Sequence, residues 1–393
     1  MVSERMKGLG TARSVIRELF EYGKVRASQI GAENVFDFSI GNPSVPSPDA
    51  VNETAIRLLT EQPDQIHAYT SAQGAPDARE RFADSLNRRF NAGCTPDRLY
   101  LTVGAAASLC CVFNGLTCPG DEFVVFAPYF PEYKVFIEGA GAKMVLIPPE
   151  IEGFQIDFDA FEKALTPHTK GVLVNSPNNP SGVVYSRETL ERLAAILTGK
   201  SKEFGHPIYL ISDEPYREIV YAGFEVPWVP HIYRDTIVCY SFSKSLSLPG
   251  ERIGYVFVPK EVTEGDDVYA AVAGAGRSLG YVCAPALFQQ TASLCCDMTA
   301  DLNIYEENAK LFVSALREMG YHVVEPGGAF YLFPRSLEPD DVAFSERAKK
   351  LDLLIVPGSG FGAPGHVRVS YCVQTETIRR ALPKFQALAD SYK

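Results

Sequence analysis

The sequence predicts an α/β protein built around a mostly parallel sheet. Short apolar runs alternate with helical patterns through the middle of the chain, which is typical of strands that are buried on both faces of a parallel sheet. The chain has 393 residues, of which 46% are hydrophobic and 22% are charged. That composition is ordinary for a globular protein, and the length exceeds what one compact core usually serves. We therefore expect two structural domains.

Seven apolar runs are the candidate strands of the large sheet. Each is short and rich in β-branched, aliphatic or aromatic residues, which favour strands. In chain order these runs are Leu99–Val103, Phe123–Phe126, Lys143–Ile147, Gly171–Val174, Ile208–Ile211, Ile237–Tyr240 and Ile253–Val258. Between two of them, Ser186–Leu197 repeats apolar residues at intervals of three to four positions, and this spacing predicts a helix.

Segments that contain proline or glycine mark the expected domain boundaries. One is Ile40–Pro48, and the other lies near Cys283–Pro285. Beyond the second boundary, a long helical stretch precedes a strand-rich part around Gly328–Phe333 and Gly365–Tyr371. The expected units are a large sheet domain and a smaller domain assembled from both chain ends, at residues 46–282 and at residues 1–45 with 283–393.

Charge and hydropathy argue against nucleic-acid and membrane partners. The chain has 37 basic and 48 acidic residues, a net charge of −11, so no broad basic surface is expected to meet a phosphate backbone. Met1–Lys7 has no apolar core of a secretory signal. The uncharged stretch Leu99–Gly120 is interrupted by glycine, asparagine and a Pro-Gly stop, which indicates a buried strand followed by a buried helix.

The cysteines and histidines predict neither disulfides nor a metal site. Nine cysteines include two adjacent pairs, and none has the spacing of a zinc site. Small buried thiols in a reducing cytoplasm explain them, and we expect a cytoplasmic protein. The six histidines are scattered along the chain, so no metal ligand is assigned.

Polar or small residues follow the carboxyl ends of several predicted strands, where open α/β sheets bind ligands. Gly104–Ser108 opens a helix after the first strand, and its N–H groups could hold a phosphate, although small residues also allow close helix packing. Asn175–Gly182 is a rigid, polar loop made of common turn formers. Ser212–Tyr216 places Asp213 at a buried strand end, where a carboxylate either needs a cationic or hydrogen-bonding partner or caps the next helix.

The segment Ser241–Gly254 contains the strongest candidate for covalent chemistry. Lys244 follows an apolar strand and is surrounded by hydroxyl-bearing and small residues, with Arg252 eight positions later. A lysine in most other places would be a surface charge. Here partial burial would lower the pKa of its amine, which makes Lys244 a candidate for Schiff-base formation.

Taken together, these segments resemble the class I/II aminotransferases of the aspartate aminotransferase superfamily, which are pyridoxal-phosphate enzymes of fold type I. The resemblance spans Gly41 to Arg368, and the family motifs occur in family order. They are Gly-x-Pro at 41–43, Tyr-(x)4-Gly at 69–74, Asn-Pro-Ser-Gly at 179–182, Asp-(x)2-Tyr at 213–216, Ser-x-Ser-Lys at 241–244, Gly-x-Arg-x-Gly at 250–254 and the late Arg368. This resemblance implies a large, mostly parallel seven-stranded sheet with helices on both faces, plus a smaller α+β domain.

The resemblance assigns roles around the pyridoxal 5′-phosphate ring. Lys244 would form the Schiff base with the coenzyme and carry the proton that leaves the substrate. Asp213 would pair with the pyridine nitrogen and keep it protonated, so that the ring acts as an electron sink. Tyr216 and Asn179 would donate hydrogen bonds to the phenolic oxygen of the ring. In addition, Asn179 would line the substrate site.

The phosphate of the coenzyme would be held by the remaining polar groups of the same loops. The family motifs imply contacts from the hydroxyl groups of Ser241 and Ser243 and from the guanidinium of Arg252. The N–H groups of Ala105 and Ala106 would complete this site at a helix start.

The remaining carried-over residues concern ring stacking, the substrate and a partner chain. Phe130 would stack on the coenzyme ring, although ordinary core packing is the alternative for this residue. Tyr69 matches a residue that reaches the phosphate of the neighbouring subunit, which implies a homodimer with shared active sites. Arg368 would bind the substrate α-carboxylate through a two-pronged contact, with Gly41 and Asn42 lining the same end of the site.

The expected reaction is transfer of an amino group from an L-amino acid to a 2-oxo acid, with 2-oxoglutarate as the expected acceptor, by a ping-pong mechanism. Aspartate and aromatic amino acids are the leading donors. The sequence does not assign the group that reads the side chain, because Ala106 replaces the lysine that some aspartate-using relatives have there. The candidates are Arg13, Arg79 and Arg277 for a distal carboxylate, and Tyr129, Phe130, Tyr133, Tyr281 and Phe330 for an apolar side chain.

Two other interpretations stay open at this point. A C–S lyase or a β-decarboxylase on the same fold would use the same coenzyme-binding residues and differ only in the fate of the carbanion. A non-catalytic, aminotransferase-like sensor is the more remote alternative. It would carry an added DNA-binding domain, whereas here the resemblance begins within about forty residues of Met1.

Overall fold

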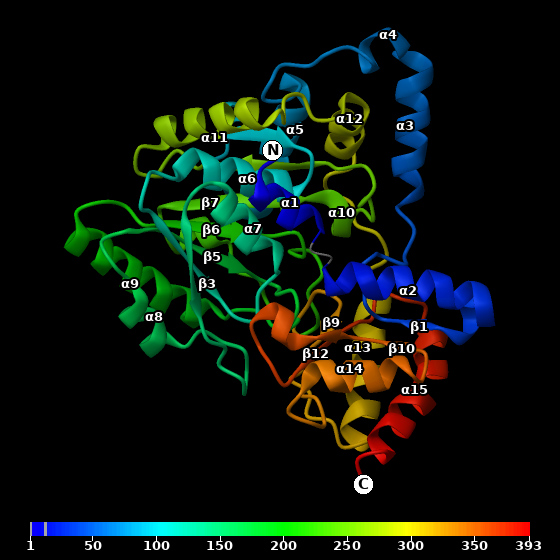
Figure 1. Cartoon of the computed structure of the whole chain (residues 1–393). Coiled ribbons are helices and arrows are strands. Elements are labelled where there is room, and N and C mark those ends of the chain that lie inside the picture. Colours follow the sequence, from blue (N-terminus) through cyan, green and yellow to red (C-terminus); the bar gives the residue numbers. More distant parts are fainter. Residues whose placement is uncertain (1, 12–13) are drawn as a thin grey trace.

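The computed structural model describes residues 2–11 and 14–393 and confirms the α/β class. Its main feature is a seven-stranded sheet with the order β2-β8-β7-β6-β5-β3-β4 (Figure 1). The neighbours β7-β6-β5-β3-β4 are parallel, whereas β8 is antiparallel to both β2 and β7. The strands are β2 Leu99–Thr102, β3 Glu122–Phe126, β4 Lys143–Ile147, β5 Thr169–Asn175, β6 Tyr209–Asp213, β7 Thr236–Ser241 and β8 Gly254–Phe257. Each coincides with a predicted apolar run to within two residues at either end.

Helices cover both faces of this sheet. On one face, α6, α7 and α11 bury aliphatic and aromatic side chains against the central strands, and α8 and α9 pack on the other. A third cluster joins α5 and α12 to β2, β7 and β8, with α3 alongside. These helices are α3 Asp49–Glu61, α4 Pro63–Ile66, α5 Pro76–Phe90, α6 Ala105–Leu116, α7 Glu132–Gly139, α8 Phe158–Ala164, α9 Arg187–Phe204, α10 Phe242–Ser245, α11 Gly265–Leu279 and α12 Ala286–Leu294.

Two of the helix predictions can be compared directly with the structure. The uncharged stretch from Leu99 forms strand β2 followed by helix α6, as expected. The predicted helix at Ser186–Leu197 forms as α9, but it continues to Phe204. Ser186 is its N-cap and accepts a hydrogen bond from the N–H of Thr189, and the helix ends at Gly205, whose left-handed conformation suits glycine. Gly199 lies inside the helix because one glycine costs too little to end it.

Segments from the two parts of the sequence that flank the large sheet come together beside it, since α2 and β1 lie against elements that follow α12 (Figure 1). Strand β1 pairs in parallel with β10, and β11, β12 and β9 form a small antiparallel sheet. Their core is rich in aromatic side chains from α13, α15 and the strands. The elements of this part are α2 Val15–Ile30, β1 Phe36–Asp37, α13 Asn303–Glu318, β9 Tyr331–Leu332, α14 Asp341–Lys349, β10 Leu353–Leu354, β11 Val356–Pro357, β12 Val367–Ser370 and α15 Thr375–Asp390. Helix α1 Glu4–Thr11 lies instead beside α7 of the large sheet (Figure 1).

Two further properties concern the whole described chain. Among the helices of residues 2–11 and 14–393, none combines the length and the hydropathy needed to cross a membrane. The cysteine side chains are free thiols, five of them buried.

Candidate active site

A cavity of ≈ 280 Å³ lies where the carboxyl ends of the central strands meet the part of the chain that contains β9 and β12. It is lined by the residues that follow β2, β5, β6 and β7, together with side chains from α2, β9 and β12. The structure thereby brings together most of the predicted site residues, namely Gly41, Ala105, Ala106, Phe130, Asn179, Asp213, Tyr216, Ser241, Ser243, Lys244, Arg252 and Arg368. This convergence follows from the parallel order of the strands, because their carboxyl ends share one edge of the sheet.

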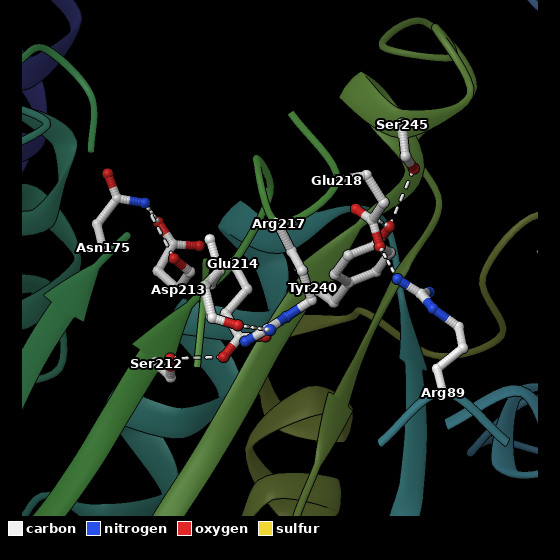
Figure 2. Close-up of polar contacts among 10 residues, drawn as sticks. Arg89, Asn175, Ser212, Asp213, Glu214, Arg217, Glu218, Tyr240 and Ser245 are labelled. Atoms are coloured by element: carbon white, nitrogen blue, oxygen red, sulfur yellow. Dashed lines mark hydrogen bonds and ion pairs between the residues drawn. The ribbon is translucent and has the colours of Figure 1, made fainter. Parts of the chain in front are cut away.

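Asp213 is a buried carboxylate with an incomplete set of partners. Asp213 is the last residue of β6. Its Oδ2 accepts a hydrogen bond of 2.5 Å from the hydroxyl of Tyr133. The same oxygen accepts a longer hydrogen bond of 3.5 Å from Nδ2 of Asn175 (Figure 2). Its Oδ1 is buried and has no hydrogen-bond partner among residues 2–11 and 14–393. Burial raises the pKa of Asp213 to about 7, and the nearby negative charge of Glu214 adds to that rise. A cationic N–H donor placed in the cavity would satisfy this carboxylate.

Lys244 presents an amine to the same cavity. It lies in the short helix α10, directly after β7, and its Nζ donates a hydrogen bond of 2.7 Å to the carbonyl oxygen of Gly41. Removal of the amine from water lowers the pKa of Lys244 to about 8, and the positive charges of Arg252 and Arg368 act in the same direction. A substantial share of the amine is therefore neutral near pH 8, as a nucleophile or a proton acceptor must be.

Groups that bind anions converge at one end of the cavity. Ala105 and Ala106 are the first residues of α6, and N–H groups in a first helical turn have no partner within the helix. The hydroxyl groups of Ser241 and Ser243 are 2.7 Å apart, and Arg252 lines the same cavity. Together these groups form a cradle for a compact dianion such as a phosphate.

Gly104 is required beside this cradle for two reasons. Its φ is +85°, which favours glycine, and it caps the N-terminus of α6. A Cβ at this position would lie 2.8 Å from Nη2 of Arg252. Any larger residue would therefore displace the arginine.

Arg368 is a buried cation with donors to spare. It lies on β12 with 2% of its surface exposed, and its guanidinium donates to Oδ1 of Asn179 at 3.0 Å and to the carbonyl oxygen of Ser39. Its Nε is buried and has no partner. The guanidinium carbon lies 4.9 Å from the ring centroids of both Tyr331 and Phe361. A planar, desolvated guanidinium of this kind suits a carboxylate ligand.

Two of the residues predicted to bind the coenzyme or the substrate backbone lie outside the cavity lining, as do the aromatic candidates Tyr129, Tyr281 and Phe330. Asn42 is exposed, and Tyr69 has 98% of its surface exposed. The candidates for reading a side-chain carboxylate are also elsewhere. Arg79 donates to the carbonyl oxygens of Gly74 and Pro96, and Arg277 is exposed at the end of α11. The remaining candidate, Arg13, lies outside the described residues.

Three contributions to the cavity were not assigned their observed contacts from the sequence, which named Tyr133 only as an aromatic candidate for an apolar substrate side chain. Asn175 ends β5 just as Asp213 ends β6, so its position at a strand end was a usable signal. Tyr133 lies on the first turn of α7 and packs edge-on against Phe130, at 5.6 Å between ring centroids. Tyr331 comes from β9, more than a hundred residues from Tyr216, whose hydroxyl it contacts at 2.8 Å. No local pattern could reveal a contact between elements so far apart in the chain.

A comparison with known protein families identifies the group to which the chain belongs. The family model described as aminotransferase class I and II matches residues 33–385. The chain is a class I and II aminotransferase. This match includes the cavity-lining loops described above, from Gly41 to Arg368.

Individual aminotransferases support the same conclusion. An aspartate/prephenate aminotransferase of Thermus thermophilus is 33% identical over 355 residues, covering 88% of each chain. An aspartate aminotransferase of Thermotoga maritima is 32% identical and covers 100% of both chains. The crystal structure of an aminotransferase from Eubacterium rectale is 55% identical and superposes with a TM-score of 0.98, covering 100% of this chain and 99% of the other.

Proposed function

We propose that this aminotransferase uses pyridoxal 5′-phosphate to move the amino group of an L-amino acid to a 2-oxo acid, with 2-oxoglutarate as acceptor, by a ping-pong mechanism. One observation carries the proposal: a single cavity holds the amine of Lys244, the incompletely paired carboxylate of Asp213 and the spare donor of Arg368. These three groups are what a coenzyme aldehyde, a pyridine nitrogen and a substrate carboxylate would each require.

The residues present fit this coenzyme. The unpartnered Oδ1 of Asp213 would accept a hydrogen bond from the protonated pyridine nitrogen. Phosphate would be held by the cradle of Ala105, Ala106, Ser241, Ser243 and Arg252, and Phe130 would pack on the ring. When bound, pyridoxal phosphate supplies an electron sink for the charge that remains after the substrate loses its Cα proton.

The chain's own side chains would perform the proton transfer and the positioning. Lys244 would take up the Cα proton of the substrate and deliver it to C4′ of the coenzyme. Its pKa of about 8 suits both the acceptance and the donation of this proton. Arg368 would bind the substrate α-carboxylate, and its contact with Asn179 would fix the guanidinium plane. Tyr216 and Asn179 would donate hydrogen bonds to the phenolic oxygen of the coenzyme.

Aspartate and aromatic amino acids are the leading donors. The cations that line the cavity within the described residues are Lys244, Arg252 and Arg368, and each already has a role. An adjoining cavity of ≈ 620 Å³ shares Ile16 and Phe130 with the first, which gives room for a large apolar side chain. The names of the relatives, aspartate and aspartate/prephenate aminotransferases, support the dicarboxylate donor.

We further propose a homodimer with shared active sites. Tyr69 is almost fully exposed, which suits a side chain that reaches into a partner subunit. In addition, α3, a helix at the outer edge of the molecule, exposes the apolar side chains of Ile56 and Leu59 (Figure 1). The cytoplasmic location stays a prediction from the sequence.

The test is a visible absorption spectrum of the purified protein with added pyridoxal phosphate, before and after single L-amino acids. A coenzyme band that converts to the amino form with aspartate or phenylalanine supports the proposal and ranks the two donors. A band that persists while pyruvate or ammonia accumulates would replace it with the lyase interpretation. If no coenzyme band forms, the proposal is wrong.

A further inference from the structure

Tyr331 lies between the coenzyme-binding part and the substrate-binding part of the candidate active site. It lies on β9 with 2% of its surface exposed and lines the cavity. Its hydroxyl is 2.8 Å from the hydroxyl of Tyr216, and the guanidinium of Arg368 lies 4.9 Å from its ring centroid. One side chain therefore contacts the residue proposed for the coenzyme oxygen and the residue proposed for the substrate carboxylate.

The position of the Tyr331 hydroxyl is fixed from a third side by Gly41. A Cβ at residue 41 would lie 2.1 Å from the hydroxyl oxygen of Tyr331, so only glycine leaves room for it. The carbonyl oxygen of Gly41 also accepts the hydrogen bond from Lys244. The hydroxyl of Tyr331 thus packs directly against the backbone that positions the reactive amine.

The direction of the Tyr216–Tyr331 hydrogen bond follows from counting protons. Burial raises the pKa of Tyr331 to about 12 and raises the pKa of Tyr216 well above its ordinary value, so both hydroxyl groups keep their protons at neutral pH. Each hydroxyl has one proton to donate. If Tyr216 donates its proton to the coenzyme, only Tyr331 can donate within the pair. A hydroxyl that accepts one hydrogen bond becomes a stronger donor in the next.

We propose that Tyr331 is a positioning residue that strengthens hydrogen-bond donation by Tyr216 to the coenzyme and supports the guanidinium plane of Arg368 for the substrate. The inference rests on the proposed function and goes beyond it, because it assigns two separable contributions to one side chain. The hydroxyl acts on the coenzyme through Tyr216, and the ring acts on the substrate through Arg368.

The hydroxyl is tested by Tyr331→Phe, which keeps the ring. Weaker donation by Tyr216 leaves more negative charge on the phenolic oxygen, which makes the nitrogen linking Lys244 to the coenzyme more basic. The pH midpoint of the visible coenzyme band should therefore rise by about half a pH unit, the size expected for weakening one neutral hydrogen bond. In Tyr216→Phe, adding Tyr331→Phe should cause no further shift.

The ring is tested by comparing Tyr331→Phe with Tyr331→Leu. Because Phe retains the aromatic face, the KM for the amino acid should change little in Tyr331→Phe. Loss of the ring in Tyr331→Leu should raise that KM roughly thirtyfold, as expected for a desolvated cation–π contact. An equal KM in the two variants would show that the ring does not support Arg368.

Tyr371→Phe is a matched control from the same aromatic core. Its hydroxyl pairs with that of Tyr221 at the same 2.8 Å, and neither residue lines the cavity. The control should leave the pH midpoint and KM at wild-type values. If Tyr331→Phe leaves the pH midpoint of the coenzyme band at the wild-type value, as Tyr371→Phe should, then the Tyr216–Tyr331 hydroxyl pair is only structural and the inference is wrong. Absence of a coenzyme band in the wild-type protein would instead reject the proposed function itself.

Discussion

Asp213 and Glu214 are consecutive carboxylates at the end of β6, and their side chains point in opposite directions (Figure 2). Alternation along an extended chain accounts for this, because successive side chains lie on opposite faces. Asp213 faces the cavity together with Tyr133, whereas Glu214 faces away from it, on the same side as Ser212. The two residues have equally little contact with water, at 4% and 1% exposure, so their difference lies in their partners.

Glu214 has partners for both of its oxygens. One accepts a hydrogen bond of 2.7 Å from the hydroxyl of Ser212, and the other accepts one from Nε of Arg217, which is also buried. The Arg217 guanidinium lies 5.1 Å from the ring centroid of Phe90 and 5.0 Å from that of Trp228. Both carboxylate oxygens of Glu214 are thus satisfied within the chain, and only Nη2 of Arg217 lacks a hydrogen-bond partner among the described residues. A buried carboxylate that is paired in this way does not leave an uncompensated charge in the fold.

Asp213, by contrast, keeps one oxygen without a partner and has a raised pKa. Leaving a buried carboxylate partly unpaired costs folding free energy, and such sites persist where function needs them. Asp213 and Glu214 are both buried, so burial alone does not distinguish a functional carboxylate from a structural one. The functional one is the carboxylate whose hydrogen bonding the protein leaves incomplete, on the side where a ligand can complete it.

We expect the largest effect from a substitution in the cavity, where loss of the Lys244 amine lowers the turnover rate. Lys244→Ala removes the amine that transfers the proton, so transamination should fall by roughly a thousandfold or more. The coenzyme should still bind noncovalently through the phosphate cradle. Steady-state assays check the first expectation and equilibrium dialysis the second. Lys260→Ala, at an exposed lysine, is the control and should keep wild-type turnover. Wild-type turnover in Lys244→Ala would contradict the assignment.

The second expectation separates the two carboxylates directly. Glu214→Gln removes the charge that pairs with the buried Arg217, so the free energy of unfolding should fall by about 3 kcal/mol. Asp213→Asn should lower activity strongly and leave the coenzyme-free protein at least as stable as wild type. Urea unfolding and activity assays of both variants provide the comparison, with Glu203→Gln at an exposed ion pair as a control. If both variants lost stability to the same extent, the contrast between the two sites would be wrong.

The third expectation is a pH dependence in the coenzyme-free protein. The pKa of Asp213 is raised from 3.8 to about 7, so the folded state holds a proton that the unfolded state has released between these values. Stability due to this carboxyl is present below about pH 4 and is lost as the pH rises to 7. The stability of Asp213→Asn relative to wild type should therefore rise over this range by a few kcal/mol. A difference that stays constant with pH would contradict a raised pKa.

The residues that could be predicted from the sequence are those whose signal is local. An apolar run followed by polar residues marks the end of a strand in the sequence. This pattern located the segments that contain Asp213, Lys244 and Asn179 at or just after strand ends, and the structure brings them to one cavity. Gly104 similarly lies at a strand-to-helix turn whose positive φ requires glycine. Parallel strand order then places these loops together without any further information.

What could not be predicted depends on contacts between distant parts of the chain. Tyr331 reaches Tyr216 only because β9 is carried to the cavity by the small sheet, and Ile16 enters the lining from α2 near the N-terminus. The family resemblance assigned the coenzyme role to Asp213, but the pairing of Glu214 with Arg217 needed the structure. Adjacent acidic residues look equivalent in a sequence, and only their packing shows which of them Arg217 neutralises.

The central claim is that a coenzyme completes the hydrogen bonding of Asp213. Its most direct test is the rise in Tm on adding pyridoxal phosphate at pH 8, compared between wild type and Asp213→Asn. Ligand binding to the folded state stabilises it by an amount that grows with the logarithm of the ligand concentration divided by Kd, so the weaker binding that follows from the lost contact should appear as a smaller rise in Tm. We predict a clearly larger rise for wild type than for the variant. Equal rises in the two proteins would mean that Asp213 does not pair with the coenzyme.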